Sequence, residues 1–224
     1  SICFKEHDLV MDEEITIIDS NTRNEKIRNF FINNKKSLIA SVTIVIVLLA
    51  AFFSLNAINE KNKIKLANKF NLAIIEFESV EKTETIKKLI NIIEEKDTTY
   101  SPLALYYLLD NNLIENIAEI NNLFDVLINE TNLENEIKNL IIYKKALYNS
   151  EFINENELIK ILNPIINSDS IWKSHALYLV AEFFYAKNEN QKAKEFFKKI
   201  LLTPNVNNEI KTQTRKRISR DLGE

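Results

Sequence analysis

The hydrophobic and polar positions of this chain divide it into three parts, and the middle part is the most distinctive. Residues 37–57 hold no charged side chain and are apolar apart from a few Ser, Thr and Asn residues. Lysines precede this run, and Glu60 and Lys61 follow it. At about 1.5 Å of rise per residue, roughly 20 helical residues match the hydrocarbon core of a bilayer. The run therefore predicts a transmembrane helix.

Two other structures also contain long apolar runs. A buried core helix seldom stays apolar on every face for this length. A cleaved signal peptide has an apolar region of about 7–15 residues followed by a small-x-small cleavage site, whereas this run is longer and no such site follows it. We therefore expect residues 37–57 to remain in the protein as a signal anchor in the lipid bilayer.

The flanks of the anchor predict its orientation. Five basic residues precede it closely and four follow it, so the charge difference favours a cytoplasmic N-terminus only slightly. Length decides more, because a long domain is translocated largely regardless of its charge. We expect residues 1–36 to form a short cytoplasmic tail and residues 58–224 to lie outside the cytoplasm.

Residues 1–36 are polar, and their apolar positions are too scattered to build a core. Met11 is the only methionine, and an ordinary-looking segment begins there, so we expect translation to start at Met11. Residues 1–10 would then be upstream sequence, and Cys3 and His7 would not belong to the protein made in the cell. A chain without cysteine forms no disulfide, which does not locate it in any compartment.

The segment just before the anchor, EKIRNFFINNKK, places apolar residues at helical spacing among basic ones. One interpretation is an interfacial extension of the anchor, with its apolar side among the lipid headgroups. The other is a docking surface for a membrane protein, and the two are compatible. The candidate docking residues are Ile27, Arg28, Phe30, Phe31, Lys35 and Lys36.

The last part of the chain, residues 58–224, is predicted to be all-α. Gly223 is the only glycine, and the tight turns that strands need favour glycine. Ser101 followed by Pro102 is typical of a helix start, and Asn111–Asn112 of a turn. Apolar periodicity predicts helices over 64–77, 86–93, 105–109, 117–127, 137–148 and 155–167, and the first of these should continue from the anchor.

The last predicted helix pair, residues 174–207, has about the 34-residue length of a tetratricopeptide repeat. Its repeat-packing positions hold Leu177, Val180, Ala181, Phe184, Ala193 and Phe197. Small residues at Ala181 and Ala193 let the two helices approach closely, and Asn190 is the expected N-cap of the second helix. The preceding unit repeats the pattern faintly, since Ala146 precedes Ala181 by 35 residues and Leu162 precedes Phe197 by 35. The fold prediction is an all-α chain with one N-terminal transmembrane helix and a tetratricopeptide-like helix-pair solenoid.

With these elements in place, the chain resembles the bacterial family of ancillary SecYEG translocon subunits, which are tetratricopeptide repeat-like inner-membrane proteins. The resemblance covers roughly residues 20–222. It is carried by IRNFFINNKK before the anchor, by Pro164 and Trp172, and by the turn and helix over 188–197. Residues 80–135 match only in helix spacing. The resemblance implies a periplasmic domain that associates with the translocon and with chaperones handling newly exported chains, and it implies no catalytic residues.

The residues themselves point away from catalysis and from cofactors. A chain with one glycine cannot build a glycine-rich phosphate loop, and no Cys/His pair has metal-ligand spacing. His175 has no identifiable catalytic partner, and Glu94–Glu95 and Glu76/Glu78 point to different helix faces. The aromatic runs 106–107 and 183–185 fit either a peptide-binding groove or core packing. We expect a protein that is not an enzyme.

Charge is unevenly distributed in the last part of the chain. Residues 76–157 carry seven Lys/Arg against seventeen Asp/Glu, a net charge of −10, and residues 158–224 carry twelve against seven, a net charge of +5. The candidate basic docking patch comprises Lys211, Arg215, Lys216, Arg217 and Arg220. It suits either a solubilising cap on the last repeat or a dock for an acidic partner. Nucleic acid is not expected, because the domain as a whole is acidic.

The sequence therefore predicts a non-enzymatic accessory subunit of the Sec translocon. Its helical domain would bind periplasmic chaperones or exported chains. The alternative is a membrane-anchored scaffold for another envelope complex, such as one for division or outer-membrane assembly. The binding face and any homo-oligomer are left open.

Overall fold

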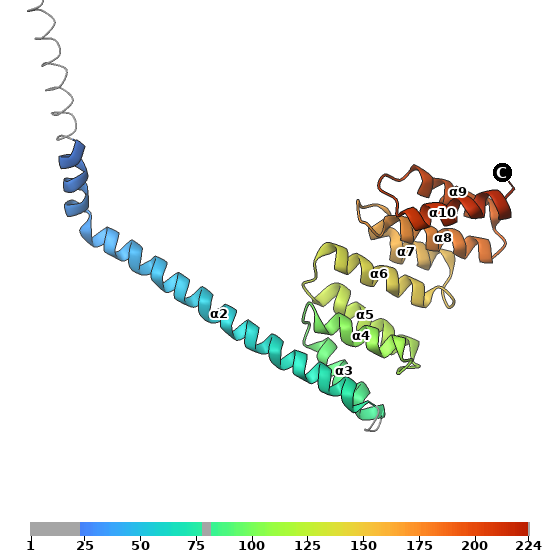
Figure 1. The fold of residues 1–224 in the computed structure, drawn as a ribbon, viewed down its shortest axis with the longest axis horizontal. Helices are drawn as coiled ribbons and strands as arrows, with labels where there is room; N and C mark the ends of the chain where they lie inside the picture. The colour runs from blue at the N-terminus through green and yellow to red at the C-terminus, as the bar shows by residue number, and fades with distance from the viewer. Residues whose placement is uncertain (1–22, 78–81, 224) are drawn as a thin grey trace, which may run out of the picture. The chain divides into compact units, whose positions relative to one another are not determined.

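The computed structural model describes residues 23–77 and 82–223, so the expectations for Met11 and residues 1–10 lie outside the described residues (Figure 1). The chain divides into two compact units at Asn62 and Lys63. Residues 23–33 are helical, and α2 (Lys35–Glu76) follows them. The predicted continuation of the apolar helix beyond residue 57 is confirmed.

The N-terminal part of α2 is one long apolar helix. The stretch Lys35–Ile75 is long and apolar enough to cross a membrane. None of the residues in its most apolar 18-residue window is buried against other described parts of the chain. Two hydroxyls near its start donate bonds within the helix: Ser41 Oγ to the Ser37 carbonyl at 3.0 Å, and Thr43 Oγ1 to the Ile39 carbonyl at 2.8 Å. Such intrahelical bonds satisfy polar groups that would otherwise meet hydrocarbon.

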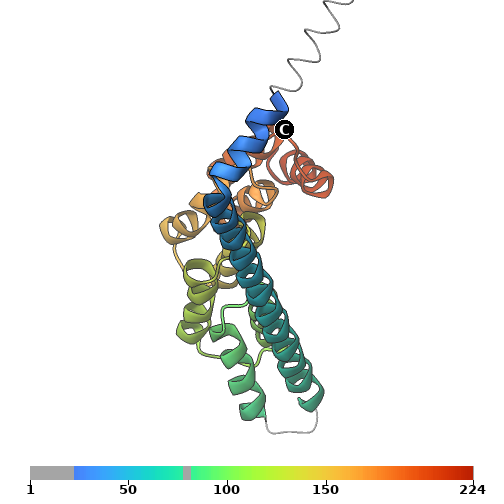
Figure 2. The same ribbon diagram turned by 90° about the vertical axis from the view of Figure 1, so that its left-hand side faces the viewer.

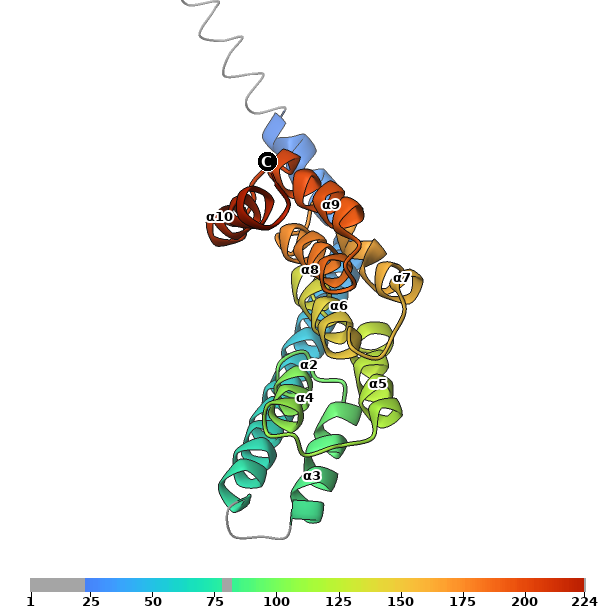
Figure 3. The same cartoon turned by 90° about the vertical axis from the view of Figure 1, so that its right-hand side faces the viewer.

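The second unit, residues 63–224, is built from helices that follow one another along it (Figures 2 and 3). Every regular element described is helical, so the all-α prediction is confirmed. Two of them, η1 and η2, are single π-helical turns that extend α5 and α10. After α2 the order is α3 (Lys82–Glu94), α4 (Tyr100–Asp110), α5 (Ile117–Asp125), η1 (Val126–Glu130), α6 (Asn135–Asn149), α7 (Glu155–Ile166), α8 (Lys173–Ala186), α9 (Asn190–Leu202), α10 (Asn208–Lys216) and η2 (Arg217–Asp221).

The helices of the second unit recur at a regular spacing. The even-numbered helices start at Tyr100, Asn135, Lys173 and Asn208, which are 35, 38 and 35 residues apart. The odd-numbered helices start at Lys82, Ile117, Glu155 and Asn190, with the same three spacings. Neighbours in the chain pack on each other: α3 on α4, α6 on α7, α7 on α8 and α8 on α9. The unit is thus an array of paired helices with an internal period.

The buried residues of the last two pairs share one register. Positions 35 residues apart are buried in both pairs, and they include the two alignments that the sequence suggests: Ile142/Leu177, Ala146/Ala181, Leu158/Ala193, Leu162/Phe197 and Ile165/Ile200. Because the spacing is constant, equivalent positions of the two pairs face their cores. The same 35-residue spacing therefore relates positions of α8 to equivalent positions of α10.

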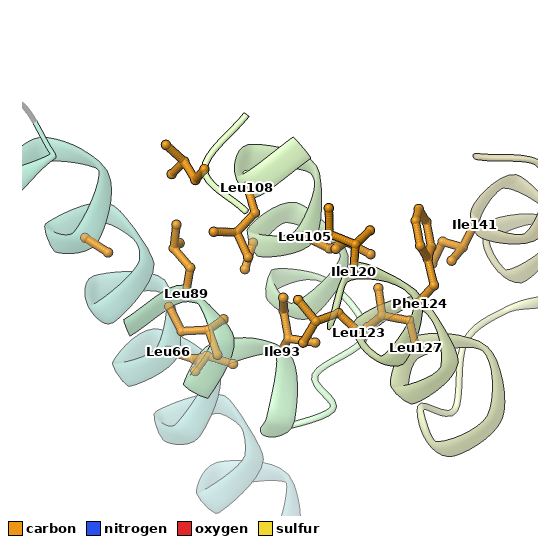
Figure 4. Close-up of a cluster of buried hydrophobic side chains, with 14 of the residues drawn as sticks. Leu66, Leu89, Ile93, Leu105, Leu108, Ile120, Leu123, Phe124, Leu127 and Ile141 are labelled. Carbon is orange, nitrogen blue, oxygen red and sulfur yellow. The ribbon is translucent and has the colours of Figure 1, made fainter. Parts of the chain in front are cut away.

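The first half of the unit has its own core cluster, in which α2 takes part. In Figure 4, Leu66 of α2 lies close to Leu89 of α3, and the cluster continues through α4 and α5 to Ile141 of α6. A second cluster begins in α6 and continues to η2, with α8 and α9 at its centre. Burial of Leu66 and Ala73 is what joins the end of α2 to the repeated helices.

The turns explain how a chain with one glycine can fold this way. Within residues 23–77 and 82–223, four non-glycine residues have positive φ: Lys96 (55°), Asn112 (49°), Asn188 (60°) and Asn205 (54°). Three of them are asparagine, which tolerates the left-handed conformation better than most residues. The predicted turn at Asn111–Asn112 is confirmed.

Two predicted N-caps are wrong. Helix α4 starts at Tyr100, and Ser101 lies inside it, where its hydroxyl donates to the Ile92 carbonyl at 2.7 Å. The Asp97 carboxylate accepts from the Thr99 and Tyr100 amides instead. Asn190 is the first residue of α9, and its N-cap residue Glu189 makes no side-chain capping bond.

Candidate functional site

The residues predicted to dock near the membrane lie in the first unit. Ile27, Arg28, Phe30 and Phe31 belong to the helix over 23–33 and are exposed, and Lys35 and Lys36 are exposed in the first turn of α2. The Phe30 and Phe31 rings meet edge to face, 6.0 Å between centroids. The structure describes exposed aromatic and basic side chains here, and their docking role stays a prediction.

The six predicted repeat-packing residues lie together between α8 and α9, and all are buried. The Phe184 ring stacks on Phe196 with 5.6 Å between centroids, and Phe197 meets Tyr178 edge to face at 5.5 Å. Ala181 and Ala193 have no exposed surface. These residues form core, so they are not available as a groove for a ligand.

Arg217, one of the five predicted basic docking residues, is tied into its own unit. Its Nε and Nη2 donate to the two Glu182 carboxylate oxygens, both at 2.8 Å, and its Nη1 donates to Asp221 at 3.0 Å. The guanidinium also lies 4.7 Å from the centre of the Tyr185 ring. Its hydrogen bonds to the Asp221 and Glu182 carboxylates raise the pKa of Arg217. Arg217 therefore holds η2 against α8.

Arg220 is paired in the same way, with the Asp221 carboxylate. Its Nε and Nη2 donate to that carboxylate at 2.7 and 3.0 Å. Bonds from Arg220 and then Arg217 lower the pKa of Asp221 to about 2. The positive charges of Arg217 and Arg220 are thus compensated by Glu182 and Asp221.

The other three residues of the predicted patch differ. Lys211, Arg215 and Lys216 form no ion pair with any residue that the structure describes, and Arg215 and Lys216 are exposed. They leave a small uncompensated positive surface on α10. The predicted patch thus divides into two arginines used in folding and three cations available to a partner.

A hollow of about 430 Å³ lies beside two of these cations, Arg215 and Lys216. It is lined by Leu201 of α9 and by Thr212, Arg215, Lys216, Ile218 and Ser219 of α10 and η2. Leu201 and Ile218 are its apolar residues, and the other four are polar or charged. Helix α10 packs against α8 and α9 at the C-terminal end of the helix array (Figure 3). The hollow, lined by residues of α9, α10 and η2, therefore lies at that end.

The hollow lies on a defined face of α10. Its four polar residues, Thr212, Arg215, Lys216 and Ser219, follow Leu177, Val180, Ala181 and Phe184 of α8 by 35 residues each. In α8 those four positions are buried in the core shared with α9. In α10 the equivalent positions are exposed. The hollow therefore occupies the face on which α8 carries its partner helix.

Four of the six lining residues, Thr212, Ser219, Leu201 and Ile218, were not singled out from the sequence. The 35-residue offset applied to Leu177 and Phe184 would have identified Thr212 and Ser219. Nothing in the sequence pattern marks Leu201 or Ile218, because their part in the hollow depends on how α10 packs on α9.

A second hollow, of about 260 Å³, lies between α2 and α3 and is lined by Lys69, Leu72, Lys88, Asn91 and Ile92. Lys69 is paired with Glu95 at 3.3 Å. This hollow lacks a group of uncompensated charges like that beside α10, so it is the weaker candidate.

His175 lies in an aromatic cluster. Its ring centre is 5.1 Å from that of Trp172 and 6.0 Å from that of Tyr143, and its Nδ1 is buried without a hydrogen-bond partner among the described residues. Burial lowers its pKa. None of Tyr107, Phe184 and His175 lines either hollow. Within the described residues, no group of three or more His, Cys, Asp or Glu could hold a metal ion.

No protein-family model, curated protein or solved structure matches this chain. The arguments below therefore rest on the chain's own residues and helices.

Proposed function

We propose that this chain is a single-pass inner-membrane protein. Residues 37–57 anchor it, residues 1–36 face the cytoplasm and residues 58–224 face the periplasm. The proposal is supported by the length and apolar character of α2, by the exposure of its apolar window and by the internal bonding of the Ser41 and Thr43 hydroxyls. Exposed Val, Leu, Ile and Phe side chains over a whole helix are costly in water and favourable in a bilayer.

The second unit is proposed to be a tetratricopeptide-like solenoid that binds proteins. The recurrence of helix starts at 35, 38 and 35 residues and the 35-residue register of the buried core support this. Solenoids of helix pairs stack similar units into an extended surface, and such surfaces mostly bind partners. The role is proposed to be non-enzymatic.

Within that class we propose an accessory subunit of the Sec translocon. The anchor and the exposed aromatic and basic residues before it would associate with SecYEG, and the solenoid would receive periplasmic chaperones or newly exported chains. The observation that carries the proposal is that α2 is one helix from its unburied apolar segment to Leu66 and Ala73, which are buried in the core of the second unit. The sequence resemblance over the membrane-proximal segment favours the translocon over another envelope complex.

The test is quantitative mass spectrometry of proteins captured with this chain from gently solubilised membranes. The matched control replaces residues 37–57 with an unrelated membrane helix and leaves both flanks intact. We expect SecY, SecE and SecG to be enriched with the native chain and depleted with the control. If another envelope complex is enriched instead while translocon subunits stay at background, the chain is a scaffold for that complex.

A further inference from the structure

We propose that the hollow beside α10 binds an acidic amphipathic helix of a partner protein. This helix would pack on α10 at the place equivalent to that of α9 on α8. The inference rests on the proposed protein-binding role of the second unit. It does not depend on the translocon being the partner.

The first argument is the register. Thr212, Arg215, Lys216 and Ser219 stand 35 residues after four α8 residues that are at most 2% exposed. On α8 these positions accept a helix whose facing residues, Ala193, Phe197 and Ile200, are fully buried. The same face on α10 therefore has the location and helical geometry to accept another helix. Its chemistry has changed from apolar to polar and basic.

The second argument is charge. An apolar helix laid on this face would bury the two cations Arg215 and Lys216 without partners, which is strongly unfavourable. Neighbouring carboxylates do not neutralise them, because Asp221 and Glu182 are held by Arg217 and Arg220. A helix with Asp or Glu on its flanks would supply the missing countercharges.

The third argument is the mixed lining. Ile218 is 8% exposed and Leu201 is partly buried, so together they offer an apolar strip beneath the cations. The hydroxyls of Thr212 and Ser219 can accept or donate hydrogen bonds at the margin. This combination suits an occupant with one apolar ridge and acidic residues on either side of it, which is the pattern of an amphipathic helix laid in a groove.

The probe is a synthetic peptide based on α9, the helix that occupies the equivalent place on α8. Its sequence is that of residues 190–202 with the four lysines changed to glutamate, fluorescently labelled and capped at both ends. The control peptide keeps the four lysines, so it has the same apolar ridge and the opposite charge. Binding to the full-length protein in detergent is followed by fluorescence anisotropy.

We expect the acidic peptide to bind and the lysine peptide to bind at least about tenfold more weakly, with affinity falling as salt rises. Arg215→Glu with Lys216→Glu should weaken the acidic peptide by about tenfold or more. The matched control is Lys82→Glu with Lys87→Glu, which makes the same charge change at exposed sites on α3 and should have no effect. Thr212→Trp fills the hollow without changing its charge and should also abolish binding. Circular dichroism checks that each variant is folded.

Three results would overturn the inference. One is equal binding of the two peptides, and another is an unchanged affinity in both the charge-reversed and the Thr212→Trp proteins. The third is no anisotropy change up to about 1 mM acidic peptide. If sedimentation shows self-association that Arg215→Glu with Lys216→Glu removes, the occupant is a second copy and the partner-helix proposal is wrong. Because the peptide assay contains no translocon, its failure is distinguishable from a failure of the membrane capture.

Discussion

Arg217 and Glu182 are joined by two hydrogen bonds of 2.8 Å, from the guanidinium Nε and Nη2 to the two carboxylate oxygens, across 35 residues of sequence. The side chains are only 28% and 26% exposed. Bidentate geometry of this kind is stronger and more specific than a single contact. The pair fixes η2 on α8 and so sets the position of the hollow.

The first prediction measures this pair. In a double-mutant cycle with Glu182→Gln and Arg217→Gln, we expect a coupling free energy of about 1 kcal/mol, because a partly exposed pair is screened by solvent. Urea unfolding of the four proteins gives the value. The exposed pair between Lys192 and Glu155, treated in the same way, should give a smaller coupling. Additive effects of Glu182→Gln and Arg217→Gln would show that the pair contributes nothing specific.

The second prediction concerns the close approach of α8 and α9 at Ala181, which has no exposed surface. Ala181→Leu inserts three carbon atoms into a filled core and should lower the free energy of unfolding by roughly 1–3 kcal/mol. Ala186→Leu makes the same change at an exposed position of the same helix and should stay within about 0.5 kcal/mol of the wild type. Equal effects of the two substitutions would contradict the packing described here.

The third prediction concerns a pair of amides between α5 and α6. Asn121 and Asn149 each donate to the other's oxygen at 2.8 Å, and Asn149 is 3% exposed. Asn121→Ala leaves the buried Asn149 oxygen without a donor and should cost roughly 1–3 kcal/mol. The control is Asn122→Ala, an exposed neighbour, which should be nearly neutral. Chemical denaturation of both variants measures the free energy of unfolding. A loss at Asn121→Ala as small as that at Asn122→Ala would contradict the prediction.

The fourth prediction is a pH dependence from His175. Burial lowers its pKa below the ordinary 6.5 in the folded protein, while Glu209 and a backbone bond at Ile171 oppose this shift. As the pH falls through about 6.5, His175 is protonated in the unfolded chain before it is protonated in the folded protein. Its contribution to the free energy of unfolding is therefore complete above that pH and is lost below it. His175→Phe keeps a ring against Trp172 and should remove this part of the pH dependence.

The measurement is the urea midpoint of both proteins between about pH 7.5 and 5.5. The two proteins differ only at position 175, so any contribution of His7 cancels in the comparison. Parallel midpoint curves for the two proteins would contradict the assignment to His175.

The elements of the fold follow closely from local sequence, because each depends on apolar periodicity and on the scarcity of glycine. The caps could not be predicted as well. Ser101 looks like an N-cap but bonds to the Ile92 carbonyl, since α3 ends beside it in the folded unit. Asn190 likewise lacks a capping role, because the turn before it closes through the Glu189 amide and the Phe184 carbonyl.

The candidate site is likewise predicted only in part from the sequence. Clustered basic residues on α10 are visible in the sequence, but the compensation of Arg217 by Glu182 requires α10 to pack against α8. Sequence proximity alone therefore treats Arg215 and Arg217 as equivalent. Their environments differ because the Arg217 side chain bonds to Glu182 of α8, whereas Arg215 lines the hollow.

The central claim is that α2 anchors the chain in a membrane with the second unit outside the cytoplasm. Single-cysteine variants test it most directly, in a background where Cys3, the only cysteine, is serine. Leu202→Cys reports the second unit at a side chain that is 84% exposed, and Ile32→Cys reports the tail at one that is 60% exposed. A membrane-impermeant maleimide is applied to intact spheroplasts and to lysed ones. We predict that position 202 is labelled in both and position 32 only after lysis. Labelling of position 32 in intact spheroplasts, with position 202 protected, would contradict the account.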